Sequence, residues 1–362
     1  MKAALQNHAL QWYANASSEL TGVRKIQVEK RIQTVAAGAM GGAGALSYKE
    51  GLIRSIKLDD AAGRCCFHPG GRLGLVVAAS GMTLYDLETG QKAMFISLKV
   101  PPSNVAFSSD GRRLVATGEW GGAQAHEAAV WEVPSGVEVG RFKSGQFSVA
   151  GTGFTLDGQP LVVGAPAGKF RTSIYQVLNG KETSFRQTTG AIIHCSFSAD
   201  GTRLFVVAGY HADVGIQTLD ARTGRELGKT PIVPGVSGCD GWCASRDGKS
   251  IAISYIGGGQ QPVSMGIGIY DVSSGKELQF MKPLGEKKTP TRFLNVALTP
   301  DGRRLVAHTY EGNVRVWEVA SGKDLALFPN PGWNCPVDVS PNGRFILTVG
   351  GNKTLRLFGM PQ

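Results

Sequence analysis

The sequence is poor in the residues that carry covalent or metal chemistry, and it has no long apolar run. Six cysteines and six histidines occur among 362 residues, and charged residues make up 18% of the chain. No stretch reaches the roughly 18 consecutive apolar residues of a membrane-spanning helix, so we expect no transmembrane segment. The cysteines form neither a secreted-type disulfide framework nor a pair of CxxC knuckles. This spacing favours buried thiols in a reducing compartment over disulfides or zinc.

Glycine, in contrast, is abundant, with 50 residues, and much of it falls in a regular series of turns. Each turn precedes a run rich in Leu, Val or Ile, and subtracting successive glycine positions gives separations of 40, 47, 43, 47, 54 and 41 residues. A period of this length is typical of a four-stranded unit repeated around an axis. The sequence therefore predicts an all-β, seven-bladed β-propeller. The turns are Gly70-Gly71, Asp110-Gly111, Asp157-Gly158, Asp200-Gly201, Asp247-Gly248, Asp301-Gly302 and Asn342-Gly343.

A second signal repeats inside the units. An apolar-aromatic stretch such as Val130–Val133 runs into a small-residue turn, here Ser135-Gly136, and a further strand follows. Apolar and polar residues alternate along these stretches, which is the period of half-buried strands, and glycine supplies the positive φ of the hairpins. Each unit therefore has four strands, named a to d from the chain's first strand to its last.

The seventh unit is incomplete as the sequence runs. It supplies strands a to c and stops at Gln362, with no segment left for strand d. Residues 52–58 alternate like a d strand and lie just before the first a strand. We expect this segment to pair with the last blade and close a propeller over residues 51–362, which would remove two exposed sheet edges.

Three segments carry a resemblance to a known family. The segments that read SSDGRRLVATG, TPDGRRLVAHTYEGNVRVWEVASGK and SPNGRFILTVGGNKTLRLFG resemble bacterial WD40 repeats. The resemblance covers residues 51–362. It implies a non-catalytic scaffold for protein–protein interaction, a subunit of a larger protein assembly in the cytoplasm.

Residues 1–50 do not fit the repeat. Apolar residues at mixed spacing and two basic pairs, Arg24-Lys25 and Lys30-Arg31, precede the Ala- and Gly-rich stretch 34–46. We interpret this region as a short helical arm and a flexible linker. The basic residues come too late, and the following stretch is too poor in leucine, for a secretory signal peptide. The cytoplasm is therefore the expected location.

Extra residues gather on one side of the predicted ring. The connections from strand b to strand c in the second to fifth units are long, and in a propeller they share one face with the d–a connections. Exposed aromatics among polar residues suit a protein-binding face, because a few such anchors supply most of the binding energy. The candidate partner-binding residues are Trp120, His126, Phe147, Phe170, Arg171, Tyr210, His211, Tyr255 and Trp333.

The opposite side offers an alternative. The net charge is +10, and arginines such as Arg72, Arg112 and Arg303 follow the hairpin glycines on the face that holds the a–b turns. Such a face could bind nucleic acid or another acidic partner. Aromatics suited to base stacking do not alternate with these arginines, so the sequence favours a protein partner.

A last alternative is an enzyme with its site at the mouth of the central channel. Asn104, His194, Asp240 and Asn295 enter their a strands there and could hold a small ligand or a metal. One His, one Asp and two Asn are a poor transition-metal set, and no carboxylate pair suits acid–base work. We therefore expect no catalytic residue, metal or cofactor. The sequence specifies neither the partner nor the oligomeric state.

Overall fold

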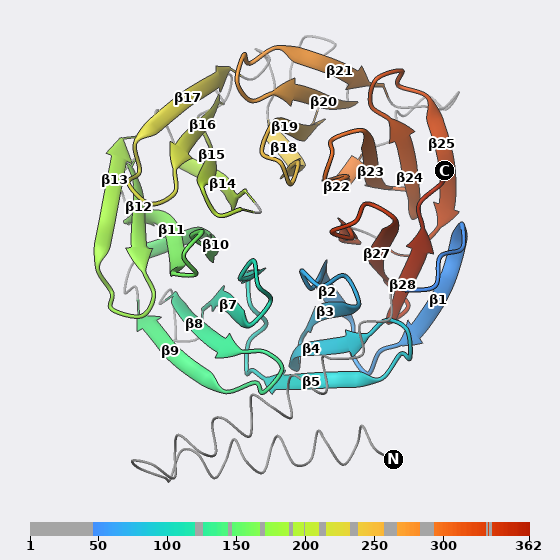
Figure 1. Cartoon of the computed structure of the whole chain (residues 1–362), viewed down its shortest axis with the longest axis horizontal. Coiled ribbons are helices and arrows are strands. Elements are labelled where there is room, and N and C mark those ends of the chain that lie inside the picture. The colour runs from blue at the N-terminus through green and yellow to red at the C-terminus, as the bar shows by residue number, and fades with distance from the viewer. Residues whose placement is uncertain are drawn as a thin grey trace.

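The computed structural model is an all-β ring of seven four-stranded antiparallel sheets, arranged as blades around a central channel (Figure 1). The structure describes residues 46–119, 126–143, 147–166, 171–187, 191–198, 200–209, 215–231, 238–256, 266–282, 293–330, 332 and 335–362. Within these ranges the chain forms no helix. The prediction of a seven-bladed β-propeller is confirmed.

Each blade contains four consecutive strands, except the last, which contains strands from both ends of the chain. In order from strand a to strand d, the blades are β2 (Ala62–Phe67), β3 (Leu73–Ala78), β4 (Gly81–Asp86) and β5 (Lys92–Ser97); β6 (Asn104–Phe107), β7 (Arg113–Gly118), β8 (Glu127–Glu132) and β9 (Glu138–Lys143); β10 (Phe147–Phe154), β11 (Pro160–Pro166), β12 (Arg171–Gln176) and β13 (Glu182–Gln187); β14 (Ala191–Phe197), β15 (Arg203–Gly209), β16 (Gly215–Asp220) and β17 (Glu226–Pro231); β18 (Gly238–Ala244), β19 (Ser250–Ile256), β20 (Gly266–Asp271) and β21 (Glu277–Met281); β22 (Phe293–Leu298), β23 (Arg304–Thr309), β24 (Asn313–Glu318) and β25 (Asp324–Pro329); β26 (Val337–Val339), β27 (Phe345–Gly350), β28 (Thr354–Gly359) and β1 (Gly51–Lys57).

The seventh blade joins the two ends of the described chain. Strand β1 pairs antiparallel with β28, from Gly51 opposite Gly359 to Lys57 opposite Thr354. Figure 1 shows this blue strand at the outer edge of the red blade. The segment expected to supply the missing d strand, residues 52–58, corresponds to β1. This pairing gives every blade four strands and closes the ring.

The residues just before β1 pack on the ring. Leu46 is buried in the cluster between blades 7 and 1. The Tyr48 hydroxyl donates a hydrogen bond to the Met360 carbonyl at 2.7 Å, and its ring lies 6.1 Å from that of Phe345. The Arg344 guanidinium stacks 4.6 Å above the Tyr48 ring. Residues 46–50, which the sequence analysis places in the arm, thus extend the closing strand. Residues 1–45 lie outside the described residues, so a helical arm there stays a prediction.

The a–b turns are built from one repeated set of hydrogen bonds. In blade 2, Ser108 Oγ donates to Asp110 Oδ1 at 2.6 Å and accepts the Arg113 N–H at 2.9 Å, while Gly111 takes a φ of 71°. A positive φ costs a residue with a side chain but not glycine, which is why the turn glycine recurs. The equivalent hydroxyl residues in the next five blades are Thr155, Ser198, Ser245, Thr299 and Ser340.

Blade 1 departs from this set, because His68 occupies the position of the hydroxyl residue. Its Nδ1 accepts the Gly70 N–H at 3.0 Å, and its Nε2 lies 2.9 Å from the Gly111 carbonyl of blade 2. A ring nitrogen that faces a carbonyl must carry the proton, so these contacts define the neutral Nε2–H tautomer. Burial lowers the pKa of His68, and the contact with the Gly111 carbonyl partly opposes that effect. The imidazole therefore joins two blades in its uncharged form.

The core consists of apolar clusters between neighbouring blades. Between blades 5 and 6, the buried Trp317 ring meets Phe293 edge-to-face at 5.5 Å. Between blades 6 and 7, a buried polar network replaces part of this apolar packing: Asn330 Nδ2 donates to Thr348 Oγ1 at 3.1 Å, and Arg356 Nη1 donates to Asn330 Oδ1 at 2.9 Å. Buried polar groups that are hydrogen-bonded in this way hold two blades in one register.

Candidate functional site

The two faces of the ring are built differently. Strand directions alternate within a blade, so the a–b and c–d turns form one face, here called the turn face, and the b–c and d–a connections form the other, here called the loop face. The b–c connection is short in blade 1, where residues 79–80 join β3 to β4, and in blade 6, where residues 310–312 join β23 to β24. It is longer in blade 2 (119–126) and in blade 5 (257–265). Variation between blades is therefore concentrated on the loop face.

The structure describes four of the nine predicted partner-binding residues at least in part. Phe147 opens β10 opposite Pro166, Arg171 opens β12 opposite Gln187, and Tyr255 lies near the end of β19 opposite Gly266. These strand ends border the loop face, as predicted. The other five residues lie outside the described residues: Trp120, Phe170, Tyr210, His211 and Trp333.

His126 is the predicted partner-binding residue with a described side chain. It lies directly before β8, and its Nε2 is 3.8 Å from Glu119 Oε1 at the other end of the same b–c connection. Two further loop-face residues escaped the sequence analysis: Tyr310, 55% exposed, and Val100, 40% exposed. Tyr310 occupies a b–c connection only three residues long, so a search for long loops passes over it.

The predicted residues of the channel mouth come from equivalent places in several blades. Asn104 pairs with Thr117, His194 with Val207 and Asn295 with His308, each across the first two strands of its blade. Asp240 differs, because the register between β18 and β19 shifts between Cys239 and Gly241. A bulge of this kind adds one unpaired residue. Gly241 therefore takes the equivalent position in blade 5, and Asp240 lies in the bulge.

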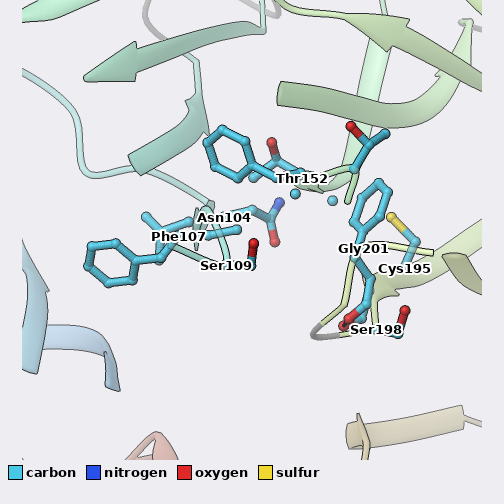
Figure 2. A pocket seen from close by; sticks show the side chains of 15 residues that line it. Asn104, Phe107, Ser109, Thr152, Cys195, Ser198 and Gly201 are labelled. Atoms are coloured by element: carbon cyan, nitrogen blue, oxygen red, sulfur yellow. Dashed lines mark hydrogen bonds between the residues drawn. The ribbon is translucent and has the colours of Figure 1, made fainter. Parts of the chain in front are cut away.

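One of these residues also lines a pocket. A space of about 230 Å³ lies along the first strands of blades 2, 3 and 4 (Figure 2). Its wall comes from β6, β10, β14 and the hairpins that follow them. Labelled in Figure 2 are Asn104, Phe107, Ser109, Thr152, Cys195, Ser198 and Gly201. All these side chains are neutral, so the pocket presents hydroxyl, amide, thiol and phenyl groups.

The first strands of blades 5, 7 and 1 carry charge instead. Asp338 of β26 accepts the Phe67 N–H of β2 at 2.7 Å and so links the last blade to the first. Burial raises the pKa of this carboxyl to about 6, although the hydrogen bonds from Phe67 and Val339 and the positive charge of Arg246 act in the opposite direction. Blades 5 and 7 are not neighbours in the ring, so Arg246 acts on Asp338 from across the channel.

The thiols among the described residues are not prepared for chemistry. Cys65, Cys66, Cys195, Cys243 and Cys335 are free. Burial raises the pKa of each, to about 12 for Cys243, and a protonated thiol is a poor nucleophile and metal ligand. Within the described part of the chain, no three His, Cys, Asp or Glu side chains converge as a metal site would require.

Comparison with known proteins gives limited likeness in sequence and clear likeness in fold. No family model matches the chain. A segment of 70 residues is 33% identical to Elongator complex protein 2 of Danio rerio, a weak WD40 likeness that covers 18% of this chain and 8% of that protein. The Kuenenia stuttgartiensis hydrazine synthase structure matches with a TM-score of 0.69 over 87% of this chain and 99% of that one, at 16% identity. At this identity the match concerns the fold alone.

The turn face binds much of its own positive charge. Arg72 Nη2 lies 2.8 Å from Asp86 Oδ2, Arg344 stacks on Tyr48, and Arg304 donates to the Pro361 carbonyl. Acidic residues also flank the c–d turns on this face, among them Asp220 and Asp271. These contacts weaken the basic-face alternative, because the arginines that follow the hairpin glycines are partly engaged or balanced.

No helix that could span a membrane occurs in the part of the chain that the structure describes.

Proposed function

We propose that this chain is a non-catalytic, WD40-like interaction scaffold that binds another protein through its loop face. The observation that carries the proposal is the contrast between the faces. Six turn-face hairpins share one hydrogen-bond set, whereas the loop face varies in length from blade to blade and exposes Tyr310 and Val100. A surface free of a structural pattern, with aromatic anchors, is suited to recognition.

The chain's relatives support the same role at a coarser level. The Danio rerio protein with the 70-residue match is named as a protein of a complex, which agrees with a subunit of a larger assembly. The free thiols among the described residues agree with a reducing compartment, and we place the protein in the cytoplasm, of bacterial type.

The test is capture of a partner from native lysate, identified by mass spectrometry, with two sets of variants. Replacing Trp120, Tyr210 and Tyr255 by Ala should abolish capture of the identified protein. The control replaces Arg112 and Arg303 by Glu on the turn face, where the Arg303 side chain is 86% exposed. We expect this control to retain the partner. Capture that survives the triple change but is lost in the control or at 0.5 M salt would contradict the proposal and favour an acidic partner on the turn face.

The non-catalytic part is tested separately through metal. A divalent ion bound only to the folded state raises stability by about 2.7 kcal/mol at a hundredfold excess over its dissociation constant. We expect the melting temperature to stay constant with calcium, zinc or a chelator, and elemental analysis to find no stoichiometric metal. A bound ion that disappears in H194A/D240A would make a metal-dependent propeller the leading hypothesis.

A further inference from the structure

The pocket along β6, β10 and β14 has the properties of a ligand site that is separate from the loop face. Its position is defined by backbone as much as by side chains, because Gly151, Gly153 and Gly201 line it. We propose that it binds a small uncharged ring compound that bears an amide, carbonyl or hydroxyl group.

The pocket is preformed. A Cβ atom at Gly151 would lie 2.4 Å from Cys195 Sγ, and one at Gly153 would lie 2.2 Å from the Phe197 ring. Strands β10 and β14 therefore already touch through backbone and side chain, and they cannot move closer to fill the space. On the other side, Thr152 Oγ1 donates to the Leu161 carbonyl at 2.8 Å, which ties β10 to its own blade. A preformed space costs a ligand no rearrangement of the protein.

One polar group is well placed to orient a ligand. The Asn104 amide extends into the pocket across from Cys195 (Figure 2). An amide supplies both a donor and an acceptor, so it can pair with an amide, a carbonyl or a hydroxyl. The Ser198 hydroxyl is instead used within its own hairpin, where it donates to Asp200 Oδ1 at 2.5 Å. Asn104 is thus the residue through which we expect polar recognition.

The wall excludes ions by its chemistry. Among the lining residues there is no carboxylate, ammonium, guanidinium or imidazole, and burial raises the pKa of the Cys195 thiol, which keeps it neutral. A charged ligand would lose hydration here without gaining a counter-charge. Phe107, Phe154 and Phe197 supply apolar surface for a ring.

The volume agrees with this class. A cavity of about 150 Å³ suffices for benzene in another protein. The present pocket, at about 230 Å³, leaves room for a ring with one polar substituent.

The test uses the full chain and five probes observed by ligand-detected NMR: uncharged benzamide, phenol and 2-pyridone, with benzoate and benzylammonium as charged counterparts. We expect at least one uncharged probe to bind saturably and at least tenfold more tightly than either charged probe. Asn104→Trp should fill the pocket and weaken binding at least tenfold. Asn104→Leu, which removes the amide at similar volume, should weaken it about fivefold and provides the readout if the tryptophan variant does not fold.

The matched controls are Asn295→Trp and Asn295→Leu. Asn295 holds the equivalent register position on β22 and does not line the pocket, so we expect both controls to bind as the unaltered chain does. The proposal is overturned if no uncharged probe saturates, if a charged probe binds as tightly, or if the Asn104 variants bind as the Asn295 variants do. None of these outcomes bears on capture of a protein by the loop face.

Discussion

The turn face and the loop face belong to the same strands, yet they follow different rules. On the turn face a Ser or Thr hydroxyl, an Asp or Asn and a glycine recur in six blades with nearly the same hydrogen bonds. On the loop face, connection lengths differ from blade to blade, and the described aromatics have no repeated role. The difference indicates that turn chemistry maintains the fold, which leaves the loop face available for recognition.

The largest effect is expected from removing the strand that completes the last blade. Deleting residues 51–59 should expose the edge of β28 and leave an aggregating protein without a cooperative melting transition, because unpaired edges template association. The measurements are light scattering and calorimetry.

Two further deletions define the boundary of the ring. Removing residues 1–40 should change the melting temperature by only a few degrees, since Leu46 and Tyr48 remain. Removing residues 1–49 should lower it further. Equal stability of the 51–59 deletion and the intact chain would reject closure by β1.

The next effect separates two glycines of the turn face. Both Gly111 and Gly158 have positive φ, but a Cβ at Gly111 would lie 2.3 Å from His68 Nε2, whereas a Cβ at Gly158 meets nothing within 4 Å. Gly158→Ala should cost about 1–2 kcal/mol of unfolding free energy, the cost of the left-handed conformation. Gly111→Ala should cost at least about 1 kcal/mol more, because it also displaces the His68 contact. Equal losses in urea unfolding would show that His68 does not bind blade 1 to blade 2.

A smaller effect concerns pH at the one exceptional turn. The folded pKa of His68 lies below its unfolded value of about 6.5, so its contribution is complete above that pH and is lost as the pH falls toward the folded pKa. Asp338 acts with the opposite sign, since its raised pKa makes stability fall as the pH rises from about 4 to 6.

The comparison variant H68S/G70D gives blade 1 the hydroxyl and carboxylate of the other hairpins and leaves Asp338 unchanged. Between pH 7 and pH 5 the unaltered protein should lose more stability than this variant, as measured by urea unfolding. Parallel curves would remove His68 from the account of pH dependence.

The sequence predicted the parts of this fold that depend on local chemistry. Turn glycines and strand alternation are written within a few residues, and the segment near Leu52 stood out because the last blade lacked a strand. The contact of His68 with Gly111 could not be read in this way, because it joins residues 43 positions apart in different blades. The bulge that displaces Asp240 also leaves no mark in the apolar pattern.

The most direct test of the contrast between the faces measures stability and partner capture on the same variants. Ser108→Ala leaves the Arg113 N–H without its acceptor and should lower the unfolding free energy by about 1–3 kcal/mol, whereas the exposed neighbour Ser109→Ala should change it by less than about 0.5 kcal/mol. Both should capture the partner as the unaltered chain does. Replacing Trp120, Tyr210 and Tyr255 by Ala should abolish capture with little loss of stability. If the triple variant unfolds but still binds when folded, or if Ser108→Ala abolishes capture at full stability, the division between a structural turn face and a binding loop face is contradicted.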